Sequence, residues 1–123
     1  MDNFCKYQAE KMKSAGLYWD QAMLLTGHDL YSSPSMDKGS SGMAYLSGMC
    51  SKVASCTIAE ARSLGSASLI IAHELAHNLG VEHDGYGDNA DCDPDDFIMG
   101  PKLSPGATAW SQCSRRQLAK FVS

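Results

Sequence analysis

Three of the chain's four histidines, together with Glu74, fall in a single short pattern at residues 73–83. Residues four apart share one face of a helix, so His73 and His77 present two imidazoles to one point. Gly80 is expected to end that helix, because glycine enters the left-handed conformation cheaply, and the returning chain then brings His83 to the same point. Three neutral imidazoles leave the fourth position of tetrahedral zinc for water, as in catalytic zinc sites.

Glu74 directly follows His73, about 100° further around the helix, so its carboxylate flanks the metal without having to bind it. This is the position of a general base for metal-bound water. We therefore predict a zinc-dependent endopeptidase that hydrolyses peptide bonds through a zinc-activated water. His73, His77 and His83 are the predicted zinc ligands, and Glu74 is the predicted catalytic base.

These residues have two other interpretations. A bare H-E-x-x-H pattern also arises by chance in ordinary helices, but this helix is apolar, and burying unpaired imidazoles and a carboxylate in it costs several kcal/mol. The second is a zinc-binding adhesion or decoy module without proteolytic activity. An intact Glu74 favours the enzyme, because zinc affinity alone does not require it. His28 lies outside the pattern in a polar stretch and is expected to be solvated.

Short elements are expected around this helix. Hydrophobic periodicity predicts helices at residues 4–15 and after Gln112, and strands or extended segments at residues 22–26, 43–46 and 57–60. Ser66 or Ser68 is expected to cap the active-site helix, which is apolar on nearly every side and so belongs in the core. Residues 31–42 have loop composition. Residues 82–96 carry seven carboxylates and are expected to form a surface loop.

Length and charge limit the classes of protein that fit. A chain of 123 residues with 44% apolar residues has room for one domain. The net charge is -4, and the cationic residues are scattered, so nucleic acid is not an expected partner. No apolar run approaches the roughly 20 residues that span a bilayer, so membrane insertion is not expected either. Met1 is not followed by a secretory signal, and any leader is expected to be absent from this sequence.

Five cysteines are many for so short a chain, and none forms the CxxC spacing of a structural zinc site. Disulfides and an oxidising compartment are therefore expected. Spacing alone leaves the pairing open, and the odd count leaves one thiol over.

The extended pattern H-E-x-x-H-x-x-G-x-x-H is that of the metzincins, and Asp84 after His83 resembles the adamalysin or reprolysin branch. Residues 97–101, with Met99, look like the Met-turn of that family. The resemblance covers almost the whole chain and is closest to ADAMTS-like catalytic domains, through segments such as 18–22, 42–44 and 110–114. It implies an α/β zincin fold: a mixed sheet packed on the active-site helix, with an irregular C-terminal subdomain.

The same resemblance implies finer features. An extended polypeptide substrate is expected to pair with the strand at 42–46, beside an S1′ wall at 100–109. The implied disulfides are Cys5–Cys56 and Cys92–Cys113, with the partner of Cys50 beyond this sequence. Asp29 and Glu60 match positions that bind calcium beside the cleft; calcium in the acidic loop is a separate alternative. We expect residues 1–123 to be part of a single metalloprotease catalytic domain, shortened at both ends, secreted, and acting on extracellular proteins.

Overall fold

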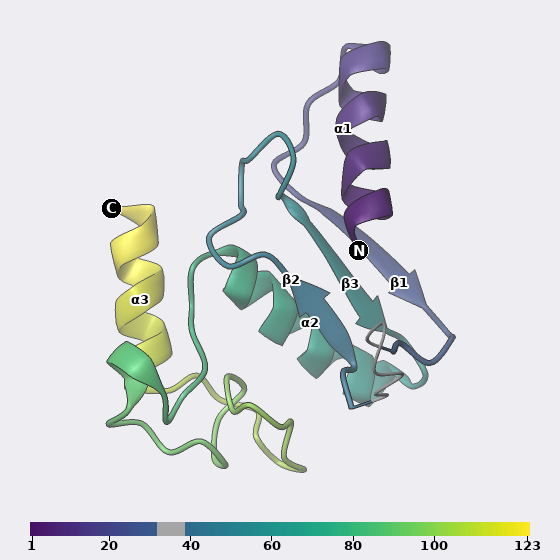
Figure 1. Ribbon diagram of the computed structural model, residues 1–123. Helices are drawn as coiled ribbons and strands as arrows, with labels where there is room; N and C mark the ends of the chain where they lie inside the picture. Colours follow the sequence, from purple (N-terminus) through teal and green to yellow (C-terminus); the bar gives the residue numbers. More distant parts are fainter. Residues whose placement is uncertain (32–38) are drawn as a thin grey trace.

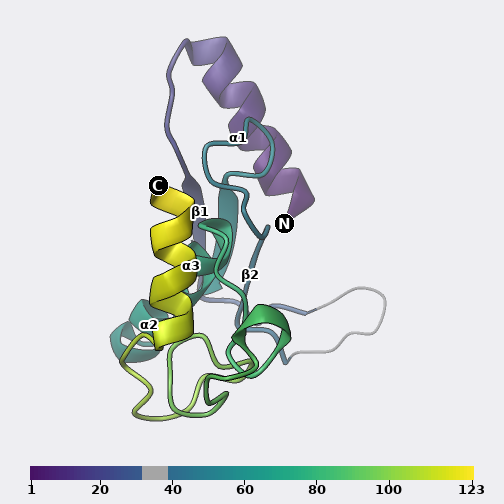
Figure 2. The same ribbon diagram turned by 90° about the vertical axis from the view of Figure 1, so that its left-hand side faces the viewer.

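The computed structural model describes residues 1–31 and 39–123 and has the expected α/β architecture (Figure 1). The elements, in chain order, are α1 (Asp2–Ala15), β1 (Ala22–Thr26), β2 (Gly42–Ala44), β3 (Cys56–Glu60), α2 (Leu64–Asn78), the 3-10 helix η1 (Gly87–Asn89) and α3 (Gln112–Val122). In both views α1 lies at one end of the molecule, and the irregular segment that follows α2 lies at the other (Figure 1, Figure 2). No described helix is long and apolar enough to cross a membrane.

A small mixed sheet positions the active-site helix. Its strand order is β1-β3-β2, so β3 is central, parallel to β1 and antiparallel to β2. All five residues of β3 are buried, because α1 and α2 pack on the strand as well as its two neighbours. This explains why the expected extended segment at 57–60 lacks the strict alternation of apolar and polar residues that marks a half-exposed strand.

The edge strand β2 is shorter than the expected strand at 43–46. After Ala44 the chain leaves the sheet, and its backbone groups form hydrogen bonds with the end of α2 instead. The Ser47 amide donates to the His77 carbonyl at 3.0 Å. The side chain of Asn78 donates to the Tyr45 carbonyl at 3.0 Å. The strand therefore stops where its backbone begins to bond the active-site helix.

The start of α2 corrects the expected cap. Ser63, and not Ser66 or Ser68, is the N-cap: its backbone is extended, and its hydroxyl accepts from the Ser66 amide. The helix therefore begins before the expected position, because the Ser63 hydroxyl bonds a backbone amide of the first turn. This turn carries no apolar pattern, since it is exposed to solvent, with Leu64 93% exposed. At the other end Gly80 has the expected left-handed conformation, with φ of 87°.

Two disulfides tie the layers together. Cys5–Cys56 joins α1 to β3, and Cys92–Cys113 joins the acidic segment to α3, with Cα–Cα distances of 5.5 and 6.2 Å. Cys50 is free and exposed. The pairing implied by the resemblance is therefore confirmed.

The acidic segment at 82–96 is not simply a solvated loop. Asp84 and Asn89 are fully buried. The Asp84 amide donates to the Met99 carbonyl, and its carboxylate accepts from the Ser111 hydroxyl at 2.7 Å. Asn89 donates to the Glu82 carbonyl and to the side chain of Gln117. The segment is folded onto α3 by these two side chains, and its remaining carboxylates face solvent or lie half-buried.

Candidate metal centre and active site

The three histidines of the motif come together at one point. His73 and His77 stand one turn apart on α2, and His83 follows the turn at Gly80. Their Nε2 atoms lie 3.0 to 3.1 Å from one another. They form one of two groups among the described residues whose donor atoms are close enough to hold a metal. The other, Asp84 with Cys92 and Cys113, has both sulfurs in a disulfide and is not a metal site.

Hydrogen bonds fix the tautomers of two imidazoles. The Nδ1 of His73 lies 2.7 Å from the Ile98 carbonyl, and the Nδ1 of His77 lies 2.7 Å from the Val81 carbonyl. A carbonyl oxygen only accepts, so both Nδ1 atoms carry the proton and the Nε2 atoms of the neutral rings carry lone pairs. No proton is left between these two Nε2 atoms, and their mutual repulsion is relieved by a cation. Imidazole nitrogen in a tetrahedral setting suits zinc, so the residues present fit that ion.

Burial keeps the three rings in the state that binds metal. Desolvation, and to a smaller extent the neighbouring His73, lower the pKa of His77 from 6.5 to about 4. Desolvation also lowers the pKa values of His73 and His83. The imidazoles are therefore neutral at neutral pH, as metal coordination requires.

The segment around Met99 packs against α2 and helps to orient the histidines. Met99 is fully buried and packs with Ala76, Val81 and Ile98 in the core cluster. The carbonyl of the neighbouring Ile98 orients His73. The carbonyl of Met99 accepts a hydrogen bond from the Asp84 amide at 2.9 Å. The turn therefore connects a residue of α2 to the segment that carries His83.

Glu74 lies beside the histidines and against the edge strand. Its side chain is buried, and desolvation raises its pKa from 4.5 to about 7. A Cβ added at Gly42 would lie only 2.5 Å from Glu74 Oε1. The carboxylate of Glu74 can therefore lie here only because residue 42 is a glycine. The sequence motif does not reveal this close approach of Glu74 to the backbone of β2.

Two hollows flank the three imidazoles. One, of ≈ 510 Å³, is lined by residues 42–44 of β2, residues 101–103 and Glu74. The other, of ≈ 450 Å³, includes Leu46, Tyr86 and Glu82. β2 is an edge strand of the described sheet, so no other described strand pairs with its outer backbone groups.

Asn78 is a further residue of the site that sequence reasoning missed. It is fully buried, and its amide nitrogen donates to the carbonyls of Tyr45 and Ala54, each at 3.0 Å. These bonds hold the end of α2 to the segment after β2. Its signal in the sequence is a polar residue on the buried side of an apolar helix. His28 is exposed and lies outside the site, as expected.

Comparisons with known proteins agree with this geometry. The model of the reprolysin (M12B) family of zinc metalloproteases matches residues 1–123. Human "a disintegrin and metalloproteinase with thrombospondin motifs 18" is 43% identical over 125 residues, covering 100% of this chain and 10% of the relative. The human protein with number 16 in the same series is 44% identical, with the same coverage. The adt-1 member from Caenorhabditis elegans is 33% identical over 99% of this chain and 8% of its own length.

The chain spans about a tenth of the length of these relatives. The family match covers every residue, and the convergent histidines provide the donor set that a zinc metalloprotease requires. The chain belongs to the reprolysin (M12B) family of zinc metalloproteases.

Proposed function

We propose that this chain is the catalytic part of a zinc-dependent endopeptidase. His73, His77 and His83 hold the zinc ion, and Glu74 is the general base. One observation carries the proposal: three neutral imidazoles converge through their Nε2 atoms beside a buried carboxylate, on the wall of an open cleft.

The mechanism follows from the positions of these groups. Zinc, when bound, acidifies a water molecule and polarises the peptide carbonyl. Glu74 accepts a proton from that water molecule while the water oxygen attacks the carbonyl carbon. Glu74 then delivers the same proton to the leaving nitrogen. A pKa raised to about 7 by burial suits a group that must both take up and release a proton near neutral pH. The free edge of β2 holds the substrate extended across the cleft.

We further propose that residues 1–123 form part of one catalytic domain, secreted and acting on extended segments of extracellular proteins. The two disulfides support this setting, because such bonds persist in oxidising compartments. The proteolytically silent adhesion or decoy module is the competing function, and no feature of the site favours it.

Three proteins test the proposal: the parent, Glu74→Gln and His77→Ala. Each is loaded with zinc, assayed for metal content, and incubated with an unfolded protein substrate with and without a zinc chelator. The parent should cleave in a chelator-sensitive way. Glu74→Gln should keep one zinc per chain while losing about 10²–10⁴-fold in kcat, because an amide cannot accept a proton. His77→Ala should lose both zinc and activity.

Two results would contradict the proposal. Glu74→Gln with turnover near that of the parent would remove Glu74 from the reaction. Folded, zinc-loaded parent protein without chelator-sensitive cleavage would favour the silent module instead.

A further inference from the structure

Two carboxylates that are not part of the histidine group lie close together where strands β1 and β3 end. Glu60 is the last residue of β3, and Asp29 follows β1 by three residues. The two strands are parallel and Thr26 pairs with Glu60, so their carboxyl ends lie side by side. The resemblance to ADAMTS-like domains implies that calcium binds between these two residues.

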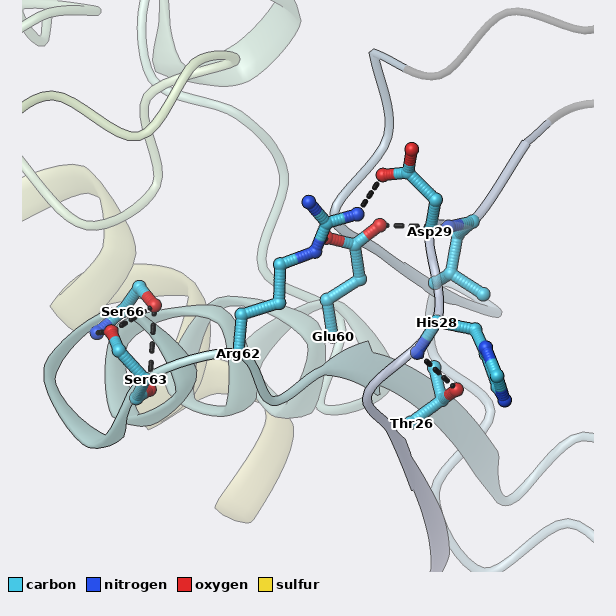
Figure 3. Close-up of polar contacts among 8 residues, drawn as sticks. Thr26, His28, Asp29, Glu60, Arg62, Ser63 and Ser66 are labelled. Carbon is cyan, nitrogen blue, oxygen red and sulfur yellow. Dashed lines mark hydrogen bonds and ion pairs between the residues drawn. The ribbon is translucent and has the colours of Figure 1, made fainter.

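The structure places a side-chain cation there instead. The guanidinium of Arg62 lies between the two carboxylates (Figure 3). Its Nη2 pairs with Asp29 Oδ1, and its Nε lies 3.2 Å from Glu60 Oε2. The second oxygen of Glu60 accepts from the Leu30 amide at 2.7 Å. Both Glu60 oxygens and one Asp29 oxygen therefore already have donors.

This donor set does not fit calcium. Calcium takes six to eight oxygen ligands, mostly carboxylates and carbonyls. Among the described residues, no third acidic, histidine or cysteine side chain joins Asp29 and Glu60 in a group that could hold a metal. A guanidinium, always protonated, would also repel a divalent cation brought against the same oxygens.

We propose that Arg62 is a built-in cation that replaces calcium at this position. It ties the end of β3 to the segment after β1 by ion pairs. Glu60 is largely buried, with 9% of its side chain exposed, while the Arg62 and Asp29 side chains are 52% and 41% exposed. Arg62 also directly precedes Ser63, the cap of α2, so the fixed strand ends hold the start of the active-site helix without a second metal ion.

The first test measures calcium dependence without using activity. Thermal unfolding of the zinc-loaded chain is followed with excess Ca²⁺ and with a calcium-selective chelator, for the parent and for Asp29→Asn. The double variant Asp29→Asn/Arg62→Gln, which removes both charges of the exposed pair, serves if the single variant does not fold. The calcium-induced change in Tm should be the same in the parent and in both variants. Calcium binding elsewhere in the chain would shift the Tm of all three proteins equally. A larger rise in the parent than in either variant would overturn the proposal.

The second test asks whether Arg62 acts as the cation. Arg62→Gln is compared with Lys52→Gln, which removes one positive charge from an exposed position outside this cluster. Arg62→Gln should lower the Tm by about 3–6 °C, because it removes the cationic partner of the largely buried Glu60 carboxylate. Lys52→Gln should leave the Tm nearly unchanged. Equal Tm values for the two variants would overturn the role of Arg62.

Discussion

Adding a single methyl group at Gly42 should displace the proposed base. The Cβ of an alanine there would lie 2.5 Å from Glu74 Oε1 and 2.8 Å from its Cδ. An ordinary contact needs about 3.4 Å, so the carboxylate must withdraw by about 1 Å. A displacement of that size in an active site can cost about 10²-fold in rate. We expect Gly42→Ala to lower kcat/KM by about 10²-fold.

The effect should be confined to catalysis. Gly42 does not have a positive φ, so alanine is compatible with the backbone of β2. The three heavy atoms nearest to the new methyl group all belong to Glu74, which is not a predicted zinc ligand. Zinc content should therefore remain one per chain, and peptide hydrolysis and metal content are measured on the same preparations.

Gly65→Ala provides the matched control. Gly65 lies in the first turn of α2, has no positive φ, and an added Cβ there would meet nothing within 4 Å. Alanine should stabilise the helix by about 0.5–1 kcal/mol and leave activity unchanged. If Gly42→Ala instead retains zinc and cleaves within a few-fold of the parent rate, the contact with Glu74 does not constrain catalysis and the reasoning is wrong.

Three further outcomes can be measured. In zinc-free protein, Glu74→Gln should raise the free energy of unfolding in urea at pH 8, by on the order of 3 kcal/mol, but not below pH 4.5. The reason is that the raised pKa of Glu74 contributes stability at low pH that is lost as the pH rises through about 7; an equal effect at both pH values would contradict it. Replacing both Cys5 and Cys56 by alanine should lower the free energy of unfolding by about 3–4 kcal/mol, since their bridge spans 51 residues; a loss below about 1 kcal/mol would show that it adds little. Native, unreduced protein should take up one alkyl group, at Cys50, which is free and exposed; peptide mapping that finds Cys50 in a disulfide would exclude this.

The candidate site was predictable because its chemistry is local in sequence. His73, Glu74, His77 and His83 lie within 11 residues, and helix geometry alone brings the first three together. The strand at 22–26 was also predictable from local sequence, since its short apolar run closed by a glycine is long enough for a strand and too short for a helix. The disulfides needed the family resemblance, because spacing did not distinguish among the pairings.

Other features depend on contacts between distant residues or on the backbone. The Arg62 contact with Asp29 spans 33 residues, and nothing in the local sequence of either one indicates the other. Asp84 was expected in a solvated loop, but the hydroxyl of Ser111 and a backbone carbonyl allow it to be buried. The true cap of α2, Ser63, was missed because its helical turn is exposed and carries no apolar pattern.

The acceptors that orient His73 and His77 are main-chain carbonyls, of Ile98 and Val81. Every amino acid carries the same carbonyl, so evolutionary change at these two positions preserves the acceptor whenever the new side chain fits the core. An inserted or deleted residue between 78 and 98 has the opposite effect, because it shifts the register of the carbonyls relative to the rings. This centre should therefore tolerate point substitution around its supports while resisting changes of loop length, and length, more than residue identity, should be what natural variation preserves here.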